Sequence, residues 1–145
     1  MSRTPPSTRD PQVWTFHMPV RWGDQDMLGH VNNAQLFVYS ESARLAFFEH
    51  VFGKKEGLFR DGSGPILAEI GCVYHRQLRY PAELEIEVRI VRIGSRSLEL
   101  QTPVFLKGED TAVADLRTTL VWFDYAAQKA VAVPELLQPY LYSEA

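Results

Sequence analysis

The sequence predicts an α+β domain in which one long helix is wrapped by a five-stranded antiparallel sheet. One segment, residues 33–52, shows helical periodicity, and five other segments alternate between apolar and more polar residues. The last four of these segments are joined by short connections, which favours antiparallel pairing. At 145 residues the chain has the length of one domain with a substantial core.

A change in period separates the first strand from the helix. Large apolar residues first recur at every second position, as in a strand with one buried face: Trp14, Phe16, Met18, Val20 and Trp22. Between Asn33 and Phe52 an apolar stripe then recurs at steps of three and four: Leu36, Ser40, Ala43, Phe47 and Val51. Gly53 is placed to end this helix.

Residues around position 32 carry the signals of a helix start. Asn32 is a favourable N-cap, and Gln35 lies three positions later, as in a capping box. Val31 and Leu36 occupy the positions of a hydrophobic staple. If Asn32 is the cap, its side chain satisfies one amide of the first turn and the N–H of Asn33 is left unpaired at the positive end of the helix dipole.

Four strands are predicted after the helix, at residues 66–78, 83–90, 98–106 and 114–122. The second of these has one apolar face and one charged face. Glycines at positions 57, 62 and 64 predict a flexible connection before the first, and residues 134–142 are expected to form a short C-terminal helix.

Composition excludes several classes of protein. A net charge of −3 provides no basic surface for nucleic acid, and no run of apolar residues is long enough to span a membrane. Residues 1–12 lack the apolar core of a signal peptide, so we expect a flexible N-terminal tail followed by one domain at residues 13–145. The single cysteine, Cys72, gives no sign of an oxidising compartment, and the expected location is cytoplasmic.

Two carboxylates, Asp24 and Asp26, precede the helix start and can lie on the same side of an extended loop. Both could simply satisfy loop amides. A calcium loop is excluded, because Leu28 and Gln35 stand at its fifth and twelfth positions. Zinc held by Asp24, Asp26 and His30 is conceivable, but acidic loops more often bind nothing, so no metal is predicted. An unpaired helical amide near two carboxylates suits a developing oxyanion beside a base or nucleophile.

The string R-W-G-D-x-D-x-x-G-H-V-N-N, followed by an aromatic-rich helix with S-A-R, resembles the hotdog-fold acyl-CoA thioesterases of the 4-hydroxybenzoyl-CoA thioesterase branch. The resemblance runs from about Phe16 to about Asp124. It implies that Asp26 is the catalytic carboxylate and that the backbone N–H of Asn33 polarises the thioester carbonyl. It also implies coenzyme A contacts at Arg96 and Ser97, no cofactor, and a homodimer or dimer of dimers with sites at the subunit interface.

The resulting hypothesis is an acyl-CoA thioesterase that releases a free acid and coenzyme A, with Asp26 as general base or nucleophile. His30 is either a second polar group of the site or a loop histidine bonded to the backbone. Asp24 is expected to organise the loop. The alternative is a non-catalytic hotdog module that binds acyl-CoA or an acyl-carrier protein.

Overall fold

The computed structural model describes residues 4–53, 58–59 and 61–143. Its regular elements follow the chain in this order: β1 (Thr15–Pro19), a short 3-10 helix η1 (Trp22–Asp24), α1 (Asn33–Phe52), β2 (Ser63–Tyr74), β3 (Glu83–Glu87), β4 (Arg89–Ile93), β5 (Ser97–Leu106), β6 (Ala114–Asp124), β7 (Lys129–Ala130) and a second 3-10 helix η2 (Glu135–Tyr140). None of the helices in this described part is long and apolar enough to cross a membrane.

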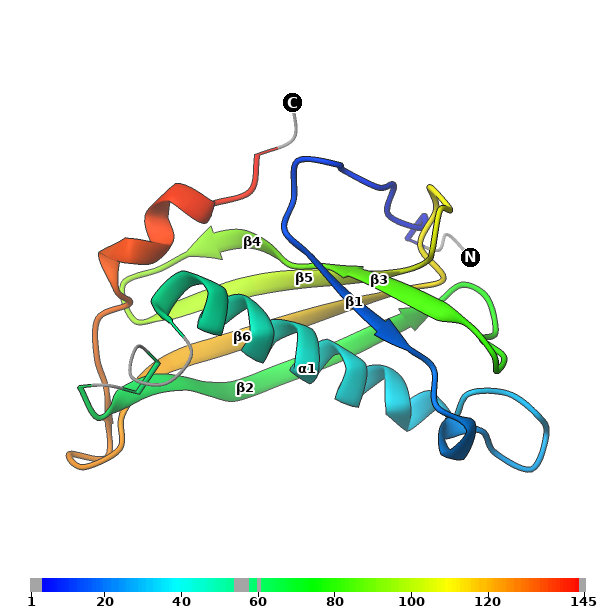
Figure 1. Ribbon diagram of the computed structural model, residues 1–145. Coiled ribbons are helices and arrows are strands. Elements are labelled where there is room, and N and C mark those ends of the chain that lie inside the picture. Colours follow the sequence, from blue (N-terminus) through cyan, green and yellow to red (C-terminus); the bar gives the residue numbers. More distant parts are fainter. Residues whose placement is uncertain (1–3, 54–57, 60, 144–145) are drawn as a thin grey trace.

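The strands form one curved antiparallel sheet with α1 lying across one face (Figure 1). The strand order is β1-β3-β5-β6-β2, so the strands before and after the helix lie at opposite edges. β4 continues β3 and pairs with β5, while the two-residue β7 pairs with β6. One helix on a curled antiparallel sheet is the hotdog architecture, which confirms the predicted fold class.

The core lies between α1 and the sheet. Four members of the predicted helical stripe are buried, Leu36, Ser40, Ala43 and Phe47, and Tyr39 and Phe48 are buried beside them. The facing sheet contributes the predicted alternating residues, among them Leu84, Ile86, Leu98, Leu100, Leu116 and Leu120. The period-two and helical patterns therefore identified these buried faces correctly, because each face follows directly from backbone geometry. Trp22 is the exception: it was predicted on the buried face of the first strand, but β1 ends at Pro19 and Trp22 lies in η1 with 74% of its surface exposed.

The helix begins and ends where the sequence predicts. The amide of Ala34 donates to the side-chain oxygen of Asn32 at 2.9 Å, and Gly53 ends α1 with a positive φ of 94°. The predicted capping box is wrong in one half. The N–H of Asn32 donates to the carbonyl of Asp24 at 2.9 Å, and Gln35 Oε1 has no partner among the described residues. A loop contact therefore takes the donor that Gln35 was expected to use.

Two strand predictions need correction. The predicted strand at 83–90 is divided at Val88 into β3 and β4, and the two-residue strand β7 was not predicted, so the described part of the sheet has seven strands instead of five. The predicted strand at 66–78 lies at Ser63–Tyr74, and it therefore includes Gly64 of the expected flexible connection. Gly57 of that connection lies outside the described residues. The predicted C-terminal helix is a 3-10 helix containing Pro139.

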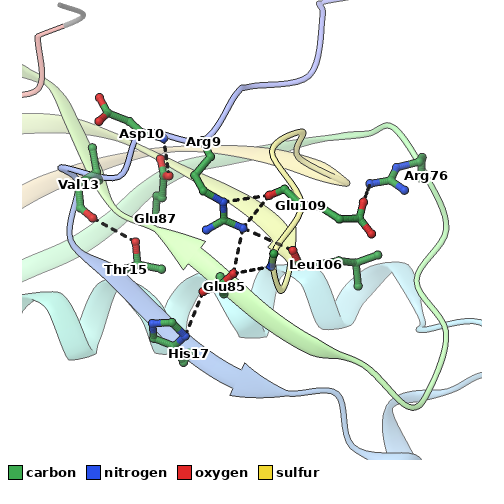
Figure 2. Close-up of polar contacts among 11 residues, drawn as sticks. Arg9, Asp10, Val13, Thr15, His17, Arg76, Glu85, Glu87, Leu106 and Glu109 are labelled. Carbon is green, nitrogen blue, oxygen red and sulfur yellow. Dashed lines mark hydrogen bonds and ion pairs between the residues drawn. The ribbon is translucent and has the colours of Figure 1, made fainter.

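The N-terminal segment differs from the flexible tail predicted for residues 1–12. In the described part of this segment, the amide of Ala112 donates to the carbonyl of Ser7 at 2.9 Å, and Arg9 donates from its amide to Asp110 at 2.8 Å. The Arg9 guanidinium bonds the carbonyl of Glu109 and pairs with Glu85 at 2.9 Å, as Figure 2 shows. Composition alone could not reveal these contacts, since the residues that hold the segment, in β3 and in the loop between β5 and β6, are distant in sequence.

This segment covers part of the charged face of β3 and β4. Glu87 is fully buried and Arg89 is 5% exposed, and the two form an ion pair. The amide of Asp10 donates to Glu87 at 2.8 Å (Figure 2), and the Arg89 guanidinium donates to the carbonyl of Thr8 at 2.6 Å. A buried pair of this kind needs such additional hydrogen bonds, because both charges have lost their hydration.

The helix cap can be tested by Asn32→Ala. Loss of the side-chain acceptor should lower the free energy of unfolding by about 1 kcal/mol, because the amide of Ala34 then has no protein partner. Urea denaturation measures this change. The matched control is Asn33→Ala, whose side chain is not the cap and whose replacement should cost within about 0.5 kcal/mol. Equal stability of Asn32→Ala and wild type would show that the cap contributes nothing.

Candidate active site

The loop between β1 and α1 is a compact hairpin-like turn. Residues Gln25 and Val31 form an isolated antiparallel bridge, and the amide of Asp26 donates to the carbonyl of His30 at 2.8 Å. Gly29 donates to the carbonyl of Asp26 at 3.1 Å with a φ of 78°, a conformation that favours glycine. The loop therefore holds residue 26 at a defined place beside the start of α1.

The side chain of Asp24 connects this loop to α1. Its side chain is 4% exposed and accepts hydrogen bonds from the Tyr39 hydroxyl at 2.6 Å and the Arg21 amide at 3.0 Å. Burial alone would raise the pKa of Asp24, but the hydrogen bonds from Tyr39 and Arg21, with the charge of Arg21, lower it overall. The structure thus places Asp24 as a charged tether between the loop and the helix.

Asp26 has one oxygen engaged and one available. Its Oδ1 accepts from the amide of Leu28 at 2.9 Å and from the amide of His30 at 3.4 Å. Its Oδ2 has no hydrogen-bond partner among the described residues. The carboxylate is therefore oriented by the loop backbone while one oxygen remains free to meet a ligand or a water molecule.

A cavity of about 300 Å³ lies where this loop, the start of α1 and the end of β2 meet. Its lining residues are Asp26, Leu28, His30, Val31, Asn33, Leu36, Tyr74, His75, Arg76, Gln77, Leu78, Val113 and Ala114. The Tyr74 hydroxyl donates to the carbonyl of Asn33 at 2.9 Å, which fixes the backbone at the helix start. The Asn33 amide has no acceptor in the described part of the chain, as the sequence predicted.

His30 also contributes to this cavity. Its Nε2 is buried and has no partner among the described residues. A buried nitrogen without a partner is unfavourable unless a ligand or water satisfies it. Three of the residues proposed from the sequence, Asp26, His30 and Asn33, are therefore brought together at one cavity.

Arg96 and Ser97 lie elsewhere. Ser97 pairs with Val121 on β6, whereas the cavity residue Ala114 pairs with Val104. Seven residues along β5 separate these positions, which is about 24 Å at ~3.4 Å per residue. Within one chain the two proposed coenzyme contacts are thus at the opposite end of the sheet from Asp26.

Sequence reasoning did not assign Tyr74 to the site, although the stretch YHRQLRYP was part of the resemblance. Arg76 pairs with Glu109 at 2.7 Å, and its side chain is about half exposed at the cavity. No local pattern in the sequence predicts that the end of β2 lies next to the start of α1, because this contact depends on how the strands pair in the sheet.

Cys72 does not resemble an activated nucleophile. Burial raises the pKa of its thiol to about 11, so the thiolate is scarce at neutral pH. Within the described residues, no three His, Cys, Asp or Glu side chains gather closely enough to hold a metal ion. Asp24 and Asp26 face different surroundings, since the first is tied to Tyr39 and the second lines the cavity.

The Asp24 tether can be tested by Tyr39→Phe. Removing a hydrogen bond to a charged group should cost about 1.5–3 kcal/mol of unfolding free energy at pH 7. Because the pKa of Asp24 is lowered on folding, this stabilisation exists above the usual pKa near ~3.9 and is lost as the pH falls through the folded value. Urea denaturation at pH 7 and pH 3 should therefore show a smaller loss of unfolding free energy at pH 3.

Tyr74→Phe is the control, because its hydroxyl donates to a carbonyl that does not titrate. Equal losses at both pH values for Tyr39→Phe would contradict the tether.

The chain is similar to solved structures from Pseudomonas aeruginosa. The PA2801 protein of Pseudomonas aeruginosa, described as a candidate thioesterase, is 33% identical; the match covers 86% of this chain and 95% of that chain, with a TM-score of 0.77. The PA5185 protein of the same species is 25% identical over 94% of each chain, with a TM-score of 0.84.

A curated relative, the uncharacterised YsmA protein of Bacillus subtilis, is 35% identical over 81 residues. This match covers 56% of the present chain and 53% of YsmA, so the chain spans about half the length of that relative. The model of the thioesterase-like superfamily matches residues 20–141, which include the loop, the helix and every strand from β2 to β7. The protein therefore belongs to the thioesterase-like superfamily.

Proposed function

We propose that this protein hydrolyses an acyl-CoA thioester to a free acid and coenzyme A, with Asp26 and the backbone amide of Asn33 at the reacting carbonyl. Membership of a thioesterase superfamily supports thioester hydrolysis in general. The observation that carries the specific proposal is the single cavity shared by Asp26 and the start of α1. A free carboxylate oxygen and a free helical amide at one cavity are the two groups that acyl transfer requires.

The Asn33 amide supports the proposal as an oxyanion donor. It is the first N–H of a 20-residue helix, so it carries the positive end of the helix dipole and points away from the helix. The Tyr74 hydroxyl and the Asn32 cap hold the backbone on both sides of it. A preorganised donor of this kind stabilises the negative charge that develops on the thioester oxygen.

Asp26 can act by either of two routes. As a general base, it takes a proton from the water that attacks the thioester carbonyl. As a nucleophile, its oxygen bonds the carbonyl carbon, the C–S bond breaks to release coenzyme A thiolate, and water then cleaves the resulting mixed anhydride. The leaving thiol has a pKa near ~8.5, so neither route needs a strong general acid.

His30 and Asp24 have supporting roles in this proposal. His30 Nε2 supplies a hydrogen bond to the attacking water or to the substrate, which would satisfy a nitrogen that has no partner in the described protein. Asp24 does not line the cavity, and it acts by holding the loop that carries Asp26.

The positions of the proposed coenzyme contacts, Arg96 and Ser97, support a homodimer or a dimer of dimers. Arg96 and Ser97 are too far from the cavity of their own chain, so they can bind the coenzyme only at the cavity of a second copy. Within the described residues, the edge strands β1 and β2 each pair with a strand on one side only, and an unpaired edge favours association with another chain. Arg76 provides a cation at the cavity of its own chain.

The function is tested by thiol release from a panel of acyl-CoA substrates with wild type and Asp26→Asn. The wild type should release free thiol, and the variant should lose about 10²–10⁴ in kcat while KM changes little, because the amide can neither accept a proton nor attack. Substrate binding without thiol release by wild type would instead favour the non-catalytic binding module.

Asp26→Asn retains the size of the side chain, so its unfolding transition serves as the control for structure. A kcat within about threefold of wild type would remove Asp26 from the mechanism. Label in Asp26 after a single turnover in ¹⁸O-labelled water identifies the anhydride route: water that cleaves the anhydride at the Asp26 carbon leaves ¹⁸O in that carboxylate, whereas direct attack by water labels only the released acid.

The shared site is tested by mixing Asp26→Asn with Arg96→Ala. Each variant alone should be impaired, but a mixed dimer contains one site with both native residues. With random exchange, half of the dimers are mixed and each has one intact site, so activity should recover to about one quarter of wild type. Light scattering on the same samples gives the mass. An active 16.6 kDa monomer, or no recovery on mixing, would contradict the interface site.

A further inference from the structure

One carboxylate joins the N-terminal segment to the candidate active site. The amide of Ser7 donates to Oδ2 of Asp115 at 3.0 Å, and Nε2 of His75 lies 2.9 Å from the same oxygen. The side chains of His75 and Asp115 are only 8% and 18% exposed. A carboxylate in its ionised form can only accept, so Nε2 of His75 carries the proton of this hydrogen bond. Ser7, Asp115 and His75 therefore form one polar cluster, although 108 positions separate Ser7 from Asp115.

His75 belongs to the wall of the cavity that holds Asp26. The amides of His75 and Arg76 both donate to the carbonyl of Val113, at 2.9 and 3.1 Å. These three residues all line the cavity. The wall is thus fixed at two points, the Val113 carbonyl just before β6 and the Asp115 carboxylate within β6.

The same wall is bonded to the loop and the helix start on its other side. The Tyr74 hydroxyl donates to the carbonyl of Asn33 at 2.9 Å, and the amide of Val31 donates to the carbonyl of Leu78 at 2.8 Å. Residues 74–78 therefore connect the polar cluster to the backbone of the proposed oxyanion donor. A displacement of the wall would move the Asn33 amide, because a continuous series of hydrogen bonds joins the two.

The N-terminal segment is itself anchored, so the Ser7 amide has a defined position. The amide of Ala112 donates to the Ser7 carbonyl at 2.9 Å, and the amide of Arg9 donates to the carbonyl of Asp110 at 2.8 Å. The Arg9 guanidinium also lies 4.6 Å from the centre of the Phe105 ring. These contacts hold the segment against the turn between β5 and β6 and direct the Ser7 amide toward the polar cluster.

We infer that Ser7, Asp115 and His75 are positioning residues for the proposed thioester hydrolysis. The Ser7 amide fixes the Asp115 carboxylate, and the carboxylate orients His75 and the cavity wall that holds the Asn33 backbone. The inference rests on the proposed function for the reaction that the cluster serves, whereas the link between the cluster and the Asn33 amide can be measured without turnover.

The expected kinetic effect follows from the step at which the Asn33 amide acts. An oxyanion donor binds charge that develops only in the transition state, so its displacement lowers kcat and leaves KM nearly unchanged. Small displacements of the reacting groups can cost up to ~10²-fold in rate. A cluster that only stabilised the fold would lower the melting temperature without changing the kcat of the folded enzyme.

The amide donor is tested by Ser7→Pro, with Ser7→Ala as the matched control, because proline lacks the N–H and alanine retains it. Thiol release from the acyl-CoA panel should show kcat lowered at least about tenfold in Ser7→Pro, with KM within about threefold of wild type. Ser7→Ala should match wild type in both constants. An unchanged kcat in folded Ser7→Pro, even with a lower melting temperature, would overturn the inference.

The carboxylate is tested separately by Asp115→Leu and Asp115→Asn. Leucine has a similar volume but cannot accept a hydrogen bond, so kcat should fall as in Ser7→Pro. The asparagine side-chain oxygen has two lone pairs and can accept from both Ser7 and His75, so this variant should retain most of the wild-type kcat. Equal kcat values for the two variants would contradict the inference. This pair also decides the question if Ser7→Pro does not fold.

Amide resonances separate failure of this inference from failure of the proposed function. In ¹H–¹⁵N spectra of the full-length protein, the Asn33 resonance should move in Ser7→Pro and stay in place in Ser7→Ala. It should also move farther in Asp115→Leu than in Asp115→Asn. If wild type releases no thiol, the proposed function fails, while these shifts would still establish that the cluster positions the Asn33 amide. An Asn33 resonance that stays in place in Ser7→Pro and Asp115→Leu would overturn the inference whether or not wild type is active.

Discussion

The hydrogen bonds around Asp24 determine where the helix starts relative to the loop that carries Asp26. The carbonyl of Asp24 accepts from the amide of Asn32, and its carboxylate accepts from Arg21 and from Tyr39 on the buried side of α1. One residue thereby links the start of η1, the loop and the second turn of the helix. The charge is retained in the interior because the Arg21 amide, the Arg21 Nε and the Tyr39 hydroxyl donate to the carboxylate and compensate for lost hydration. These bonds act together with the Asn32 cap and the Tyr74–Asn33 hydrogen bond in holding Asp26 and the Asn33 amide.

A second set of polar contacts stabilises the far wall of the same cavity. The N-terminal segment bonds Asp110 and Ala112, and the amide of Ser7 donates to Asp115 at 3.0 Å. Asp115 in turn pairs with His75 at 2.9 Å, next to Tyr74 at the end of β2. Val113, Ala114 and His75 line the cavity, so the N-terminal segment contacts the stretch of chain that forms this wall. The candidate site thus depends on the N-terminal segment and on β6 as well as on the conspicuous loop motif.

The inner face of α1 combines two environments. Near its middle, Ser40 and Thr102 share a hydrogen bond of 2.7 Å beneath the helix, and Arg44 extends this polar layer to Thr118. Farther along, Phe47 and Phe48 pack edge to face with the aromatic residues around them. The aromatic residues need no hydrogen-bond partner. In the polar layer, the hydroxyls of Ser40, Thr102 and Thr118 all have hydrogen-bond partners. The Arg44 guanidinium has more hydrogen-bond donors than it has acceptors among the described residues.

Local patterns in the sequence were sufficient for the helix, its Asn32 cap, its Gly53 end and the buried faces of the strands, because each depends on backbone geometry over a few residues. They were also sufficient to place Asp26 and Asn33 near each other, since only six residues of loop and cap lie between them. Contacts between distant segments were decided only by the tertiary structure. The burial of Glu87 and Arg89 under the N-terminal segment, the meeting of Tyr74 with Asn33, and the 24 Å or so between Ser97 and the cavity all follow from strand order and register. Strand order arises from packing of the whole sheet, which no local pattern encodes.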